Sequence, residues 1–109
     1  MTLDGNYRVL EVKGEKELPQ DIIFNFNPVG NRVSGNAGCN QFSALYHLKG
    51  AQLEFSTPMN TRKFCEGRME IERQILASLE MASRIEETES EVVLFAKNDE
   101  PLLILTKIE

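Results

Sequence analysis

The segment from Ser34 to Phe42, which reads SGNAGCNQF, most constrains how this chain can fold. It gathers small and backbone-bonding residues at a place where a globular domain normally has apolar ones. Gly35 and Gly38 permit a positive φ or a close approach of two backbones, and the side chain of Asn40 can hydrogen-bond to neighbouring amides. Cys39 is small and favours burial. The segment therefore predicts a tight, internally bonded corner.

A second segment, Thr61 to Cys65, carries the only other cysteine and lies just before the strongest helical pattern of the chain. We expect the two segments to meet in space. Cys39 and Cys65 can form a disulfide, can be two small buried neighbours, or can be redox active. Many more than two residues separate them, which disfavours the C-x-x-C chemistry of thioredoxins. The disulfide and the buried pair both remain open interpretations.

Composition places the chain among ordinary globular domains. Its 109 residues, 41% hydrophobic and 27% charged, are enough for one core, so we expect a single domain over residues 1–109. The net charge of -5 disfavours nucleic-acid binding, which depends on clustered Lys and Arg. No apolar run is long enough to span a bilayer, and no secretory leader is recognisable in the sequence.

Strand patterns surround one helical pattern. The segment 66–83 is expected to be an amphipathic helix, because Ile71, Ile75 and Leu79 recur every four residues. Strands are expected at residues 7–12, 22–26, 32–34, 42–48, 52–56, 84–88, 91–96 and 102–108, with a loop at 59–64 and a turn at 97–101. The order predicts an α+β fold, in which a curved, mostly antiparallel and partly open barrel-like sheet packs with one helix.

Two motifs in this order resemble the META domain family, also called HslJ-like. The stretch GNAGCN from Gly35 to Asn40 resembles the family signature G-x-x-G-C-N, and Thr61 with Cys65 resembles its T-x-x-x-C segment. The resemblance covers nearly the whole chain. It implies that a structural motif is formed by Gly35, Gly38, Cys39, Asn40, Thr61 and Cys65. Members of the family are lipoproteins or secreted proteins of the cell envelope that are associated with heat shock and stress responses.

The function that the resemblance implies is a non-enzymatic module. We expect it to lie in the cell envelope or periplasm, as a lipoprotein whose leader is not part of this sequence, and to bind a protein partner or support envelope stress tolerance. A cytoplasmic location is the alternative. We expect no catalytic residue, because the Asp and Glu side chains mostly lie in loops, on the outer face of the helix or in the acidic run 86–91. We expect no cofactor. We also expect no metal, because His47 and the two cysteines lie on three separate segments without a zinc-binding spacing.

A small apolar ligand or lipid is the second hypothesis. A sheet that closes incompletely can leave a cavity for an acyl chain. The candidate lining residues are Phe24, Phe26, Phe42, Phe55 and Leu79. An ordinary packed core explains the same residues, because they are needed for stability whether or not a pocket exists. An enzyme or an enzyme inhibitor is the third hypothesis.

Overall fold

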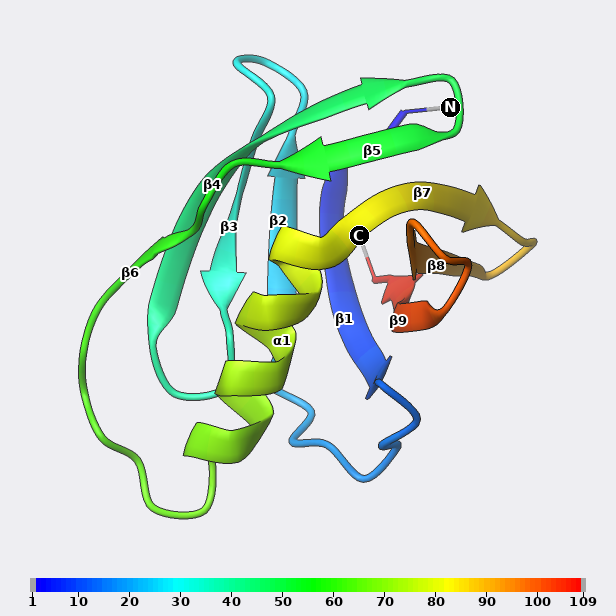
Figure 1. Ribbon diagram of the computed structural model, residues 1–109. Coiled ribbons are helices and arrows are strands. Elements are labelled where there is room, and N and C mark those ends of the chain that lie inside the picture. Colours follow the sequence, from blue (N-terminus) through cyan, green and yellow to red (C-terminus); the bar gives the residue numbers. More distant parts are fainter. Residues whose placement is uncertain (1, 109) are drawn as a thin grey trace.

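The computed structural model describes residues 2–108, which form nine strands and one helix (Figure 1). The elements are β1 (Gly5–Val12), β2 (Ile23–Asn27), β3 (Arg32–Asn36), β4 (Gln41–Lys49), β5 (Gln52–Phe55), β6 (Met59–Asn60), α1 (Met69–Met81), β7 (Ala82–Glu87), β8 (Glu91–Ala96) and β9 (Pro101–Lys107). This confirms the expected α+β class with one amphipathic helix.

Eight of the strands close into a barrel. Hydrogen-bonded neighbours follow the order β3-β2-β1-β9-β8-β7-β5-β4, and β3 also pairs with β4, which completes the ring. Every pairing in the ring is antiparallel. The expectation of a partly open barrel is corrected here. Closure depends on the length of β4, because its first five residues pair with β3 and its last four pair with β5.

The pairing between β5 and β7 is the shortest strand pairing in the ring. Gln52 lies opposite Arg84, and the backbone amide of Ile85 donates a hydrogen bond to the carbonyl of Ala51 at 2.9 Å. No other pair of neighbouring strands in the ring, within residues 2–108, is joined over so short a length. The sheet therefore closes into a barrel, but β5 and β7 are paired over only a short length.

Helix α1 is shorter than the segment expected from the sequence. The residue before it, Arg68, has φ -121° and ψ -6°, and Ala82 after it has φ -63° and ψ 137°, which is extended. Strand β7 consequently follows the helix without a loop and begins before Arg84, where the strand was expected. Within residues 2–108 the structure contains no helix with the length and apolarity needed to cross a membrane.

Several strand boundaries differ from expectation by one or two residues, and two segments change their assignment. The segment 59–64 is not entirely a loop, because Met59 and Asn60 form β6 by pairing with Ser43 and Phe42. Pro101, expected in a turn, is the first residue of β9. A proline is tolerated at that position because the first residue of a strand can lack a donated ladder hydrogen bond.

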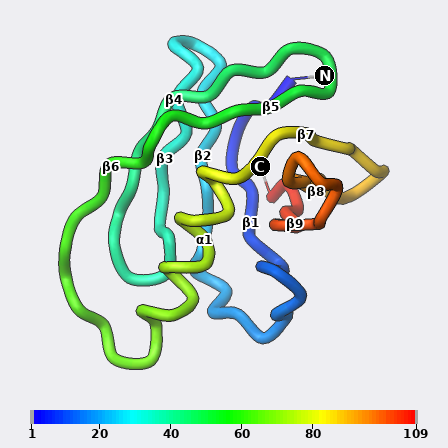
Figure 2. The backbone as a smooth tube through the Cα atoms, in the orientation of Figure 1, coloured from blue at the N-terminus to red at the C-terminus, as the bar shows by residue number. Residues whose placement is uncertain are grey.

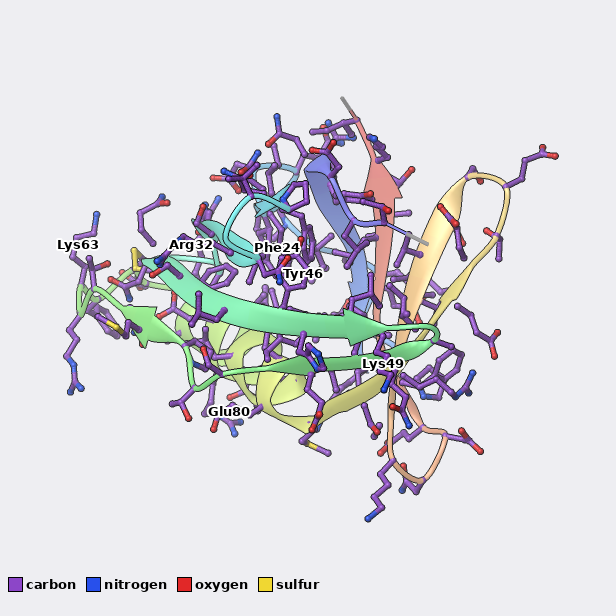
Figure 3. The ribbon with its side chains drawn as sticks, turned by 90° about the horizontal axis from the view of Figure 1, so that it is seen from above. Phe24, Arg32, Tyr46, Lys49, Lys63 and Glu80 are labelled. Carbon is purple, nitrogen blue, oxygen red and sulfur yellow. A yellow bond between two sulfur atoms is a disulfide. The ribbon has the colours of Figure 1, made fainter. Side chains whose placement is uncertain are left out.

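Aromatic and aliphatic side chains fill the interior of the barrel. The rings of Phe26 and Tyr46 meet edge to face with their centroids 5.4 Å apart, and Figure 3 shows Phe24 and Tyr46 pointing toward the interior. From α1, Ile75 and Leu79 are fully buried, and the helix contacts β1, β5, β8 and β9. The helix and both sides of the ring thus share one core.

Candidate functional site

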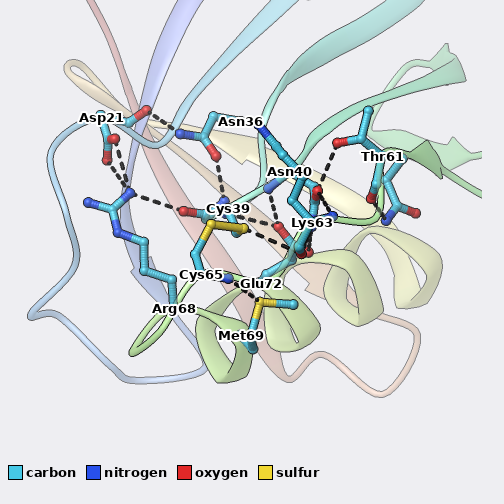
Figure 4. Close-up of a disulfide and its surroundings, with 12 residues drawn as sticks. Asp21, Asn36, Cys39, Asn40, Thr61, Lys63, Cys65, Arg68, Met69 and Glu72 are labelled. Atoms are coloured by element: carbon cyan, nitrogen blue, oxygen red, sulfur yellow. Dashed lines mark hydrogen bonds and ion pairs between the residues drawn. A yellow bond between two sulfur atoms is a disulfide. The ribbon is translucent and has the colours of Figure 1, made fainter.

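The predicted corner, Ser34 to Phe42, consists of the end of β3, the connection 37–40 and the start of β4, and it lies against the first turns of α1 (Figure 4). Gly35 and Gly38 have φ of 153° and 133°. A Cβ on Gly35 would overlap the carbonyl oxygen of Ile23, and a Cβ on Gly38 would lie 3.2 Å from the Cβ of Glu72. Glycine at position 38 therefore allows the helix to approach the corner.

Asn40 is the centre of the hydrogen-bond network at this corner, and only 1% of the residue is exposed. Its Nδ2 donates to the carbonyl of Lys63 at 3.0 Å and to Oε2 of Glu72 at 2.7 Å. Its Oδ1 accepts from the hydroxyl of Thr61 at 2.8 Å and from the backbone amide of Lys63 at 2.6 Å. All four bonding positions of the amide are used. One side chain thus joins the corner, the loop after β6, and the helix.

Glu72 supplies the helix side of the network, and it is 4% exposed. Its Oε1 accepts from the backbone amides of Cys39 at 2.9 Å and Asn40 at 2.6 Å. Burial raises the pKa of this carboxyl, but the hydrogen bonds from Asn40 and Cys39 outweigh burial and hold the pKa below the ordinary value of 4.5. Neutral donors therefore stabilise a buried negative charge at the base of α1.

The structure joins Cys39 and Cys65 in a disulfide, with their Cα atoms 5.7 Å apart. The sequence left open whether the two cysteines form a disulfide or a buried pair, and in the structure they form the disulfide. The cysteines are 26 positions apart, and closing a loop of that length is worth about 3 to 4 kcal/mol in the chain-entropy account of disulfides. The bridge attaches the segment before α1 directly to the corner.

Arg68 adds a polar contact on the outer side of the corner. Its guanidinium donates to the carbonyl of Gly38 and to the carboxylate of Asp21, in both cases at 3.0 Å. Asn36 links the same residues, because it accepts from the amide of Gly38 at 2.8 Å and donates to the carbonyl of Asp21 at 3.2 Å. These contacts attach the loop that leads to β2, which carries Asp21, to the corner.

Glu72 is not among the site residues that the sequence analysis identified. The signal was present in the helical period. Glu72 precedes Ile75 by three residues and Leu79 by seven, so it lies on the buried stripe of α1. A carboxylate on an apolar stripe indicates a buried hydrogen-bonding partner.

The candidate lining residues of the apolar pocket lie in the core. Phe24, Phe26, Phe42 and Leu79 are buried, and Phe55 is partly buried and packs against them. The rings of Phe24 and Phe42 meet edge to face with centroids 4.9 Å apart. The structure thus brings these residues together as neighbours that pack on one another.

The segment that contains β6 and the loop after it is the most exposed apolar part of this region. We call residues 59–64 the β6 loop. Figure 2 shows the chain leaving the barrel after β6 and returning to the start of α1. Met59 is 75% exposed and Phe64 is 80% exposed. Met59 and Phe64 are thus exposed apolar side chains on a segment that is fixed to the barrel at both ends.

A shallow hollow of about 480 Å³ lies beside the β6 loop, on the wall formed by β3, β4 and β6. It is lined by Ser34, Gln41, Phe42, Ser43, Met59, Asn60 and Thr61.

Residues 2–108 contain no group of three or more His, Cys, Asp or Glu side chains placed to hold a metal ion. The polar atoms of the corner bond mainly to one another, which suits a structural role that holds the β6 loop in place.

The chain is similar to one protein family and to several solved structures. The family model described as META domain matches residues 1–109. No curated protein matches the chain. An NMR structure of a protein from Burkholderia xenovorans is similar, with a TM-score of 0.76 and 22% identity over 97% of this chain and 83% of that one. A crystal structure of a DUF4847 family protein from Bacteroides vulgatus has a TM-score of 0.73 and 10% identity over 96% and 93% of the two chains. These structures support the fold.

Proposed function

The chain belongs to the META domain family, and we propose that it is a non-enzymatic module of the cell envelope that binds a protein partner through the β6 loop. We propose that it acts there as a lipoprotein or periplasmic domain and supports envelope stress tolerance. The observation that carries the proposal is the exposure of Met59 and Phe64 on a loop whose backbone is fixed.

Apolar exposure favours a partner because methionine and aromatic side chains are enriched at the centres of protein interfaces. Met59 and Phe64 lie within six residues of each other, and each leaves most of its surface in water. Their burial against another protein would be favourable, at about 25 cal/mol for each Å² of apolar surface removed from water.

The attachments of the β6 loop favour binding in a second way. Strand β6 pairs with β4 at one end of the loop, Asn40 holds Thr61 and Lys63 in the middle, and the disulfide at Cys65 fixes the other end. A loop ordered before binding loses little conformational entropy when a partner docks. The corner therefore supports the proposed function by presenting Met59 and Phe64 in one arrangement.

The proposal can be tested by site-specific photo-crosslinking in the cells that naturally produce the protein. A benzophenone amino acid at position 64 is expected to capture one discrete protein, and the same group at position 97, in the turn between β8 and β9, is not. The captured protein, once identified and purified, should bind the wild-type chain in solution, and Phe64→Ser should weaken that binding at least tenfold.

Val29 offers a matched control, since it is also an exposed apolar residue, at 83%, but lies in the turn between β2 and β3. Val29→Ser should leave the affinity unchanged. Equal capture from positions 64 and 97, or an equal loss of affinity in both serine variants, would show that the β6 loop is not the binding surface.

A further inference from the structure

Charge is divided unequally along this acidic chain. Residues 22–65 carry four basic side chains, Arg32, Lys49, Arg62 and Lys63, and one acidic side chain, Glu54, which gives a net charge of +3. The rest of the chain carries eight basic and sixteen acidic side chains, a net charge of -8. The positive segment runs from β2 to the β6 loop. One part of the barrel is therefore basic although the protein is acidic.

The basic side chains lie along the same wall as the hollow. Arg32 is opposite Leu45 across β3 and β4, and Ser34 is opposite Ser43. These side chains point outward, because the intervening residues Val33 and Ala44 are buried. We call the outward side of β3, β4 and β6 the outer face. It turns away from the core and includes the hollow.

Strand β6 extends the outer face. Met59 is opposite Ser43 on β4, and Ser43 is opposite Ser34 on β3, so these three neighbouring residues all line the hollow. Arg62 and Lys63 follow immediately along the chain. In Figure 3, Arg32 and Lys63 lie on the same side of the molecule, away from the β7 and β8 hairpin. The hollow thus has basic groups toward both ends.

These basic groups are available to a ligand. Among residues 2–108, no ion pair is formed by Arg32, Arg62 or Lys63. Leu45 at 49% exposure and Met59 at 75% add apolar surface next to them. Most of the exposed lining of the hollow is apolar, although several of its lining residues are polar. Such a hollow with flanking positive charge is complementary to an apolar side chain between negative charges.

Building on the proposed function, we propose that the outer face binds an extended acidic segment of the partner protein. One apolar side chain of that segment lies in the hollow against Met59. Carboxylates before and after it face Arg32 at one end and Arg62 with Lys63 at the other. A second copy of this chain is a poorer occupant, because a two-fold contact would place these basic side chains against one another.

Selection of peptides on the intact protein tests this directly. A phage-displayed library of random 12-residue peptides is selected against the wild-type protein. We expect the enriched sequences to combine Asp or Glu with a central apolar residue, and one synthetic representative to show amide chemical shift changes at Ser34, Ser43, Met59 and Thr61. Its affinity should fall several-fold between low and physiological salt.

Two variants and one matched control separate charge from shape. Arg62→Glu with Lys63→Glu should weaken peptide binding at least tenfold, and Ser43→Leu, which fills the hollow, should do the same. Lys16→Glu with Lys97→Glu makes the same change of net charge in an exposed loop and an exposed turn elsewhere, and should stay within twofold of wild type. Thermal unfolding checks that each variant is folded, and the charge variant decides the question if Ser43→Leu does not fold.

Several outcomes overturn the inference. These are the selection of no peptide, the selection of peptides without acidic residues, and unchanged binding in the Arg62→Glu, Lys63→Glu variant. Binding to phosphatidylglycerol vesicles but to no peptide would assign the outer face to a lipid surface instead. Photo-crosslinking from position 64 that survives Arg62→Glu with Lys63→Glu would refute the acidic segment but keep the proposed function. If position 64 captures no protein in the chain without the charge substitutions, both the acidic segment and the proposed function are refuted.

Discussion

The Oε1 atom of Glu72 on α1 lies 2.6 Å from the backbone nitrogen of Asn40 at the corner between β3 and β4. This hydrogen bond spans 32 positions of sequence and ties the first turns of the helix to the barrel. The side chain of Asn40 then binds the carbonyl and amide of Lys63. Glu72 and Asn40 therefore hold the β6 loop to the barrel together with the pairing of β6 and the disulfide.

Replacement of Glu72 by glutamine should destabilise the fold. The amide oxygen can keep part of the bonding, but the amide nitrogen then faces donors on Asn40 or Cys39. With hydrogen bonds to a charged group worth about 1.5–3 kcal/mol each, we expect a loss of about 2–3 kcal/mol in the free energy of unfolding at pH 7. Urea denaturation measures it. Glu70→Gln, on the exposed side of the helix, should leave the stability nearly unchanged.

The same variant gives a pH prediction with a defined sign. The pKa of Glu72 is lower in the folded protein than its ordinary value of 4.5, so its ionised form favours folding. Its contribution is complete above pH 4.5 and is lost as the pH falls through the folded-state pKa. Wild-type stability should therefore decline more steeply below pH 4.5 than that of Glu72→Gln. Parallel acid profiles of the two proteins would contradict this account of Glu72.

Much of the fold is predictable from local patterns. Apolar alternation and turn residues place eight of the nine strands, and the four-residue period of Ile71, Ile75 and Leu79 places the helix. Strand β6 is not predictable in this way, because two residues are too few to show alternation. Closure of the barrel depends on pairings such as Gln52 with Arg84, which are distant in sequence and leave no local signal.

The site is predictable to a different extent. The resemblance to a family points to the corner, Asn40, Thr61 and both cysteines, whereas only the helical period points to Glu72. The exposure of Phe64 has no signal in the sequence, because an apolar residue in a loop can equally pack on the core. Its exposure follows from the hydrogen bonds and the disulfide that hold the loop backbone on the barrel surface.

Gly38 should be more sensitive to substitution than another glycine with a positive φ. Gly38 has φ 133° and would place a Cβ 3.2 Å from Glu72, whereas Gly14 has φ 86° and open space around it. Gly38→Ala combines backbone strain with displacement of the helix and is expected to cost about 2–4 kcal/mol. Gly14→Ala carries strain alone, about 1 kcal/mol. Equal urea midpoints for the two variants would refute the close approach at Gly38.

Removal of the disulfide should destabilise the protein without abolishing the fold. Cys39→Ala with Cys65→Ala is expected to lower the free energy of unfolding by about 3 to 4 kcal/mol, as the chain-entropy account predicts for a loop of this length. Asn40 and Glu72 still hold the corner, so the near-native circular dichroism spectrum should persist. Amide hydrogen exchange should accelerate most at residues 61–65. A uniform acceleration over the whole barrel would mean that the bridge supports the core itself.

Ser78 provides the opposite kind of test, a buried polar group whose removal should not harm the fold. It is 0% exposed, and among residues 2–108 its hydroxyl oxygen has no hydrogen-bond partner. Burial of an unpaired hydroxyl is unfavourable by about 1–3 kcal/mol.

Ser78→Ala removes that penalty and leaves only a small void, so stability should be unchanged or higher, by up to about 1 kcal/mol. Ser78→Thr keeps the hydroxyl, adds a methyl group to a packed site, and should destabilise. A loss of more than about 1 kcal/mol in Ser78→Ala would instead show that the hydroxyl bonds to a buried water.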